Sequence, residues 1–431
     1  MNPLYRAVKG TRDLLPPESE RWNEAEWLAR DIFRSYGYGE IRTPALEDTA
    51  LFARSVGETT DIVHKEMYTF RDRKGRSLTL RPENTAGVVR SLVESGAVNG
   101  PMPLRLYYMG SQFRYERPQA GRYREFRQIG AELLGVPGPA AEVELLGMLF
   151  TFLRALGFAS LSVSLNSVGT AASRAAFAEA LRAHLTPKSE SFTEDDRRKL
   201  AENPLRLFDS KDPAVRAAME GAPRVLDFVD EESRRHHEEV QALLSATGIP
   251  FAEDATLVRG LDYYTRTVFE VVSKDLCAQD AILGGGRYDR LVETLGGPSV
   301  PAIGFAIGED RLLQVAPFAI PPRGFVAVLP QGPDDVAEAM KIAEEIRHHH
   351  PGLSTEVDLL ARGFKKGVGR ANAFLEEAER QGVDPERTFA LFVGERERAG
   401  DFVAIKNLKT GEQTTFPRSG VATWFAPPGA E

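Results

Sequence analysis

Residues 104–135 read LRLYYMGSQFRYERPQAGRYREFRQIGAELLG, two long extended runs joined by the loop RPQAGR. A Gly/Pro connection between such runs predicts a long β-hairpin over residues 104–116 and 123–135. Because side chains alternate along a strand, two polar sets should each share one face: Gln112, Arg114 and Glu116, and then Gln128, Gly130 and Glu132. A sheet face packed on a core would be apolar, so this face is either solvated or lines a ligand site.

Two further fragments carry charged residues where a strand runs into a helix. They are SLTLRPENT at 77–85, with Arg81, Glu83 and Thr85, and AIGFAIGEDRL at 302–312, with Asp310 and Arg311. Each fragment alone also fits a strand cap, a surface ion pair or a helix start. Together with the hairpin they supply arginines and acids on several sheet elements, as a site for a phosphate and a zwitterion requires.

The stretch LVRGLDYYTRTVFE at 257–270 mixes strand-forming apolar residues with charged ones. Arg259 and Asp262 interrupt a pattern that otherwise indicates a buried strand, and burying an unpaired charge costs several kcal/mol. Strict alternation would send Tyr263 and Tyr264 to opposite faces. The nearby GGGRY at 284–288 by itself predicts a turn or tight strand packing more often than a ligand site.

Along the rest of the chain, periodicity predicts a small number of domains. Amphipathic helices are expected over residues 18–36 and about 140–156, and EIRTPALE should form a short strand that Pro44 confines to an edge or bulge. Residues 170–250 are charged and helix-prone, which predicts a helical insertion. After a linker at 316–324, strands alternate with helices at 333–347 and 365–381, which predicts a small separate α/β domain.

Composition sets the outer bounds. The 431 residues suggest two to four domains, and their net charge of −8 argues against a generally basic nucleic-acid-binding surface. Residues 114–127 nevertheless hold five arginines against two glutamates. No apolar run is long enough to span a membrane, no signal core begins the chain, and one cysteine fits a reducing, cytoplasmic compartment. Neither a phosphate-binding loop nor a dinucleotide fingerprint is present in the sequence, and the histidines at 348–350 suit a helix C-terminus better than a metal.

Taken together, these motifs resemble those of histidyl-tRNA synthetases, which are class II aminoacyl-tRNA synthetases. GSQFRYERPQAGRYREFRQIGAE resembles motif 2 of that class, GFAIGEDRL motif 3 and EIRTPALE motif 1. LVRGLDYYTRTVFE and GGGRYDRL resemble the two signatures that distinguish histidyl enzymes. NPLRLFDSK resembles part of the family's insertion, and the similarity runs from about Ala7 to Phe416.

The resemblance implies an α+β fold: an antiparallel sheet of six or seven strands flanked by helices. It implies a catalytic domain over residues 1–169 and 251–318, a helical insertion domain over 170–250, and an α/β anticodon-binding domain over 324–417. It also implies a homodimer built through the motif 1 elements, without any membrane association.

The implied reaction joins L-histidine to tRNA(His) in two steps. Histidine and ATP, which arrives with Mg²⁺, give histidyl-adenylate and pyrophosphate, and the histidyl group then moves to the 3′ end of the tRNA. Because two anions must meet, positioning and charge stabilisation dominate such catalysis. By resemblance, Arg114 and Arg259 hold the α-phosphate, Arg311 the distal phosphates, and Glu116 the adenine; no tightly bound protein metal is implied.

Histidine recognition is carried over in the same way. Glu83, Thr85 and Gln128 match positions around the ammonium and backbone of the amino acid. Glu132 and Tyr264 match those that bond the imidazole, with Tyr263 beside them. In the motif 2 loop, Arg117, Gln119 and Arg122 should approach the tRNA acceptor end. In the C-terminal domain Arg362, Lys365, Lys366 and Arg370 are either tRNA contacts or a solvated helix face.

The chain departs from the family pattern at two of these motifs. Asn84 stands where the family usually has glycine in RPEGT, which puts the turn holding Glu83 and Thr85 in question, and Arg127 stands where histidine is common.

Two other functions compete with the enzyme. One is a non-catalytic regulatory subunit of ATP phosphoribosyltransferase, which typically lacks the RGLDYY-type signature and the anticodon domain. The other is a tRNA-binding module without chemistry, which would leave the arginines idle.

Overall fold

The computed structural model describes residues 4–57, 60–116, 121–258, 260–273, 281–320, 323–363, 365–369, 372–373 and 383–425. The chain divides into two compact units. The first comprises Met1–Asp13 and Ala25–Phe318, and the second comprises Leu14–Glu24 and Ala319–Glu431. Each unit has its own sheet, so the α/β character predicted beyond residue 324 is confirmed.

The first unit is built on a sheet in which eight strands of the described chain pair in the order β1-β5-β6-β11-β10-β9-β7-β8. In that order the strands are Gly39–Glu40, Leu104–Phe113, Glu125–Leu134, Ala302–Gly308, Ala281–Arg287, Thr265–Ser273, Leu161–Ser167 and Phe251–Glu253. The six strands from β5 to β7 are mutually antiparallel, as expected. The short edge strands β1 and β8 pair parallel to their neighbours, and these two edge additions exceed the expected number of strands.

The predicted hairpin is confirmed as β5 and β6, which pair antiparallel along their whole length. A second, small sheet has the order β2-β4-β3, with strands Leu46–Asp48, Ser77–Leu80 and Tyr68–Arg71. The stretch EIRTPALE therefore does not form one strand. It divides between β1 and β2 on either side of Pro44, whose nitrogen has no proton to donate to a ladder.

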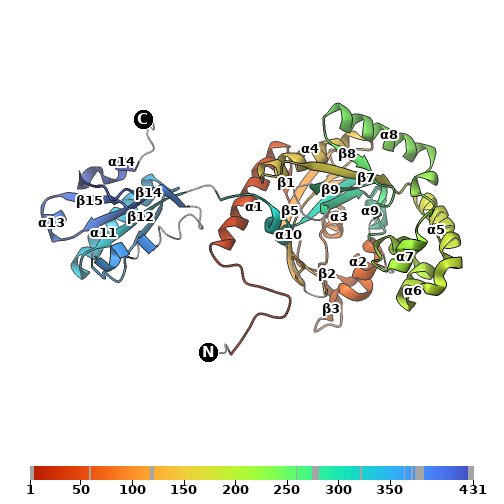
Figure 1. Ribbon diagram of the computed structural model, residues 1–431, viewed down its shortest axis with the longest axis horizontal. Coiled ribbons are helices and arrows are strands. Elements are labelled where there is room, and N and C mark those ends of the chain that lie inside the picture. The colour runs from red at the N-terminus through yellow and green to blue at the C-terminus, as the bar shows by residue number, and fades with distance from the viewer. Residues whose placement is uncertain are drawn as a thin grey trace. The chain divides into compact units, whose positions relative to one another are not determined.

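Helices accompany both sheets of the first unit (Figure 1). They are α2 Thr49–Val56, α3 Thr85–Glu94, α4 Ala140–Ala155, α9 Leu291–Thr294 and α10 Glu309–Val315, with α1 Glu18–Ser35 shared between the two units. The periodicities at 18–36 and 140–156 correctly predict α1 and α4. Short 3-10 or π turns add η1 Ile62–Glu66 and η2 Ala97–Asn99.

The insertion is helical, as predicted, and its helices gather on the side of the sheet where β7 and β8 lie (Figure 1). Its helices are α5 Ala171–Leu185, α6 Glu194–Glu202, α7 Pro213–Ala218 and α8 Glu231–Ala246, with the 3-10 turns η3 Thr186–Ser191, η4 Pro204–Asp209 and η5 Val225–Asp227. Phe177, Leu181 and Leu200 belong to a hydrophobic core of its own. That core lets short helices fold without a sheet of their own.

The second unit contains a five-stranded sheet of order β13-β12-β14-β15-β16. Its strands are Ser354–Val357, Arg323–Pro330, Val383–Val393, Phe402–Asn407 and Gln413–Pro417, and its helices are α11 Val336–His349, α13 Glu395–Ala399 and α14 Val421–Trp424, with η6 Pro333–Asp335 and η7 Arg418–Gly420. Of the helix predicted at 365–381, residues 365–369 and 372–373 are described and helical. Across the described residues of both units, no helix combines the length and apolarity that a membrane span requires.

Candidate active site

A cavity of about 130 Å³ lies against β6, β10 and β11 in the first unit. Its lining includes six residues that the sequence predicts for the site: Glu83, Thr85, Arg114, Gln128, Tyr263 and Tyr264. The cavity is smaller than the ~300–1,000 Å³ of pockets for drug-sized ligands. It therefore suits a single amino acid, and the second interpretation of the β6 face, a ligand site, is the one that the structure supports.

Glu132 lies next to this cavity and is bonded by residues that line it. Thr85 Oγ1 donates to its Oε1 at 2.7 Å, and the Tyr288 hydroxyl donates to its Oε2. The carboxylate fits because Gly304 is opposite on β11, where an added Cβ would lie 1.7 Å from Glu132 Oε2. Burial raises the pKa of Glu132 to about 8, although the two hydroxyl donors act in the other direction.

The turn before α3 holds Glu83 and Thr85 in place. The Glu83 carboxylate accepts hydrogen bonds from the backbone nitrogens of Thr85 at 2.6 Å and Ala86 at 3.0 Å, while its burial raises its pKa. Asn84 has φ −113°, a conformation open to any residue, and its Oδ1 accepts from Thr43 Oγ1 at 2.7 Å. Asparagine is thus accommodated where the family usually has glycine, and the turn keeps both neighbours at the cavity.

The tyrosine pair lies in an irregular segment rather than a plain strand. β9 begins only at Thr265, Arg266 has φ +51°, and the β9–β10 register shifts between Gly286 and Arg287. Both Tyr263 and Tyr264 therefore line the cavity, with ring centroids 4.8 Å apart.

The glycines of GGGRY serve close packing, as their sequence predicts. A Cβ at Gly286 would lie 2.8 Å from Tyr264 Cδ1, and one at Gly285 would lie 2.6 Å from Phe269 Cζ. Larger residues at these positions would push the neighbouring rings out of place.

Arg114 follows the end of β5 and faces two cavities. Its Nε donates to the Pro82 carbonyl at 2.8 Å, and its Cζ lies 5.2 Å from the centroid of the Phe126 ring. The prediction of one shared strand face is wrong here. β5 ends at Phe113, Glu116 N donates to Arg114 O at 2.9 Å in a turn, and Gln112 is fully buried without lining either cavity.

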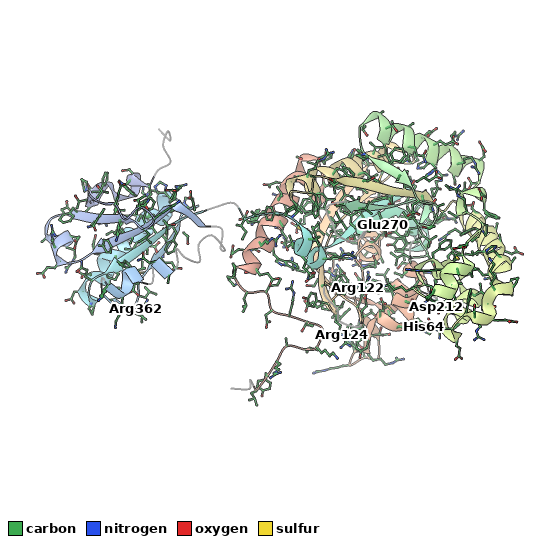
Figure 2. All side chains as sticks on the ribbon, in the orientation of Figure 1. His64, Arg122, Arg124, Asp212, Glu270 and Arg362 are labelled. Carbon is green, nitrogen blue, oxygen red and sulfur yellow. The ribbon has the colours of Figure 1, made fainter. Side chains whose placement is uncertain are left out.

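The second, larger cavity has a volume of about 680 Å³ and shares Arg114, Leu261 and Tyr264 with the first. Its cationic lining residues come from the sheet, the motif 2 loop and the insertion: Arg114, Arg122, Arg174, Lys199, Arg206 and Lys211. Asp61, Glu66, Asp262 and Glu270 are its acidic ones. Figure 2 labels Arg122 and Glu270 on this part of the molecule. Six cations against four acids suit a polyanionic ligand.

The remaining predicted residues are placed as follows. Glu116 pairs with Arg122, with 3.5 Å between Oε2 and Nη1, and Arg122 is exposed. Arg311 on α10 lies beside the motif 2 loop, since a Cβ at Gly121 would be 3.8 Å from its Cβ, but it is not among the described lining residues of either cavity. Arg259, Arg117 and Gln119 lie outside the described residues, as does Arg370.

Sequence reasoning missed several lining residues, chiefly Tyr108, Tyr288 and Phe305. Tyr288 lies two positions after the last glycine of GGGRY, and Tyr108 faces Gly130, where a Cβ would lie 2.3 Å from its Cζ. For Tyr108 the available signal was the glycine in the facing strand, because a glycine within a strand marks a close approach by a bulky neighbour.

Comparisons with known proteins identify the family of this chain. Residues 10–312 match the sequence profile of the family described as histidyl-tRNA synthetase. Histidine–tRNA ligase of Lacticaseibacillus casei is 44% identical over 98% of this chain and 97% of its own length. Histidine–tRNA ligase of Synechococcus sp. is 46% identical over 98% of this chain and 99% of its own length.

Solved structures give the same result at the level of the fold. The apo histidyl-tRNA synthetase of S. aureus has a TM-score of 0.77 at 35% identity, covering 98% of this chain and all of that one. A Bacillus halodurans protein, described as an ATP phosphoribosyltransferase regulatory subunit/histidyl-tRNA synthetase, has a TM-score of 0.63 at 22% identity and covers 86% of this chain and 97% of that one, which shows the fold alone. With near-complete coverage by sequence relatives and a profile match over residues 10–312, this chain belongs to the histidyl-tRNA synthetase family.

Proposed function

We propose that the smaller cavity binds L-histidine and that the larger one receives ATP, so that this histidine–tRNA ligase forms histidyl-adenylate where the two cavities meet. The observation that carries the assignment is the buried Glu132, held by Thr85 and Tyr288 beside a cavity of single-amino-acid size. A neutral imidazole has one ring nitrogen that donates a hydrogen bond and one that accepts it. A carboxyl group surrounded by hydroxyl groups offers partners for both nitrogens.

Arg114 supports the first chemical step because it lines both cavities. The histidine carboxylate attacks the α-phosphorus of ATP, which arrives with Mg²⁺, and pyrophosphate leaves. A guanidinium at the junction offsets the repulsion between the two anions and the charge that develops on the phosphoryl oxygens. Arg259, Arg311 and Glu116 keep the roles that the family resemblance gives them: α-phosphate, distal phosphates and adenine.

Selectivity rests on buried polar groups that only histidine satisfies. Glu132, Tyr264 and Tyr263 surround the imidazole, while Glu83, Thr85 and Gln128 hold the ammonium and backbone. Gln128 Oε1 is buried without a partner among the described residues, which suits an acceptor awaiting an ammonium. A substrate lacking the ring nitrogens would leave such groups unpaired, which can discriminate by about 10⁴.

The remaining partners follow the same family logic. Arg117, Gln119 and Arg122 of the motif 2 loop would meet the acceptor end of tRNA(His), and residues 324–417 of the second unit would bind the anticodon. Residues 1–169 and 251–318 would form the catalytic domain, interrupted by the helical insertion at 170–250. We further propose a cytoplasmic homodimer.

The regulatory-subunit alternative is not favoured. The relatives that are 44–46% identical over nearly the whole chain are histidine–tRNA ligases. The RGLDYY-type signature and a C-terminal α/β unit are both retained in this chain.

ATP–pyrophosphate exchange tests the proposal. Exchange should require histidine and should not proceed with any other amino acid, because only the imidazole completes the buried bonds. Folded protein that shows no histidine-dependent exchange would overturn the enzyme assignment. Exchange that proceeds equally with several amino acids would overturn the role of the smaller cavity.

A further inference from the structure

The Tyr263–Tyr264 segment is held at both ends by the start of the helical insertion. At one end, Arg174 Nη1 on α5 donates to the Asp262 carbonyl at 2.8 Å. At the other end, Arg266 N donates to the Gly169 carbonyl at 2.8 Å, and Val168 N donates to the Arg266 carbonyl at 2.7 Å. Residues 168–174 therefore bracket the two tyrosines that line the smaller cavity.

The bracketed segment needs such support because its backbone is not relaxed. Arg266 has φ +51°, which costs a non-glycine residue free energy unless its surroundings maintain it. Its two backbone bonds to residues 168 and 169 do so, and its Nη2 pairs with Glu232 Oε1 of α8 at 2.6 Å. Without these ties, a regular strand would send Tyr263 and Tyr264 to opposite faces.

Arg174 supplies a side-chain hydrogen bond from α5 to this segment, and its setting strengthens that bond. Burial lowers the pKa of Arg174, while the charge of Asp262 acts in the other direction. A charged donor in a desolvated position makes a stronger hydrogen bond than a neutral one in water. Asp262 is fixed from the other side as well, since its nitrogen donates to the Val56 carbonyl at 3.1 Å and its carboxylate packs over Gly57.

We propose that Arg174 is a positioning residue for histidine recognition: it ties the helical insertion to the Tyr263–Tyr264 segment and so sets the amino-acid cavity even when no tRNA is bound. This inference rests on the proposed function of that cavity. It gives the insertion a part in the first step of the reaction, because a movement of α5 is transmitted through Asp262 to the adjacent tyrosines.

The test is tRNA-free ATP–pyrophosphate exchange by Arg174→Met, which keeps the length of the side chain and removes its donors. We expect the KM for histidine to rise roughly tenfold, the size of one charge-assisted hydrogen bond, and the KM for ATP to rise by a smaller factor, because Arg174 is also one of the six cations that line the larger cavity. Arg182→Met is the matched control. Arg182 lies on the same helix and also donates to backbone carbonyls, but those of Leu200 and Ala201 within the insertion, so both KM values should stay as in the wild type.

Other results would overturn the inference. A rise in the KM for ATP with that for histidine unchanged would make Arg174 a phosphate ligand of the larger cavity. Equal effects of Arg174→Met and Arg182→Met would make its role merely structural. If Arg174→Met does not fold, Arg174→Lys replaces it, and the rise in its KM for histidine is compared with the rise in its KM for ATP in the same way. A wild-type protein without histidine-dependent exchange would instead refute the proposed function, which the variants do not address.

Discussion

Two carboxylates buried in the first unit show how contacts decide their chemistry. Glu142 accepts from His236 Nε2 at 2.7 Å and from Arg287 Nη2 at 2.7 Å, and both residues are buried. Burial alone would raise its pKa, but these partners lower the pKa of Glu142 to about 2. Glu132 is equally buried but is bonded by hydroxyls only, so its pKa rises to about 8. The first is a structural ion pair, and the second remains available to a ligand.

The raised pKa of Glu132 predicts a pH dependence of stability in the ligand-free protein. Because the folded state holds this proton more tightly than the unfolded chain, its stabilising effect is present below the ordinary carboxyl pKa and is lost as pH rises toward about 8. Glu132→Gln is neutral at every pH. Between about pH 5 and about pH 8.5, the Tm of the wild type should therefore fall relative to that of the variant by about 2 °C or more.

Thermal unfolding of both proteins across this pH range provides the measurement. Glu125→Gln is the control, since Glu125 is an exposed carboxylate on the same strand, and its Tm should follow the wild type. Parallel Tm curves for the wild type and Glu132→Gln would show that Glu132 ionises normally.

At the scale of elements, the central strands make room for the site by omitting side chains. β6, β10 and β11 each carry glycines at positions where a Cβ would meet a neighbouring side chain. Gly130 admits Tyr108, Gly286 admits Tyr264, and Gly304 admits Glu132. Glycine destabilises a strand because it loses more backbone entropy on folding than other residues do. The sheet bears this cost at positions where side chains from adjacent elements must approach the cavity.

Gly304→Ala should therefore disturb the site directly. The added methyl would meet Glu132 Oε2 and the Ala131 carbonyl, so we expect a loss of about 1–3 kcal/mol in the free energy of unfolding and a raised KM for histidine. Gly308→Ala at the end of the same strand meets nothing within 4 Å and should change stability by no more than about 0.5 kcal/mol. Denaturant unfolding and pyrophosphate exchange measure the two effects. Equal behaviour of the two variants would show that Glu132 can move aside freely.

At the scale of the whole molecule, motif 1 and elements near it in the sequence expose large apolar side chains. Leu46 on β2 is 44% exposed, Trp27 on the preceding helix α1 is 57% exposed, and Phe70 on β3, at the other edge of the three-stranded sheet, is 46% exposed. Single exposed apolar residues are ordinary, but residues of this size on elements expected to form an interface support the proposed homodimer.

Leu46→Glu should consequently weaken self-association. A carboxylate would have to be desolvated in the interface, so the variant should sediment as a single chain at concentrations where the wild type sediments at twice that mass. Leu243→Glu is the control, because Leu243 is 36% exposed on α8, outside motif 1. Sedimentation velocity decides the question. A wild type that sediments as one chain, or a Leu46→Glu dimer as stable as the wild type, would contradict the proposed interface.

The sequence alone determined the features that depend on local order. The six predicted positions that line the smaller cavity came from the resemblance of the motifs to a known family. Periodicity and turn residues, by contrast, placed α1, α4, the hairpin and the helical insertion. These predictions succeed because amphipathic spacing and turn residues act over a few neighbours along the chain.

Only the tertiary structure decided the features that depend on distant segments. β5 ends before Glu116, and Tyr108 joins the site opposite Gly130 of the next strand. Tyr288 joins it through its bond to Glu132, and Arg174 reaches the tyrosine segment from the insertion. The opposite pKa shifts of Glu132 and Glu142 have the same origin. Desolvation and hydrogen-bond partners are set by packing between residues far apart in sequence, and no local pattern encodes them.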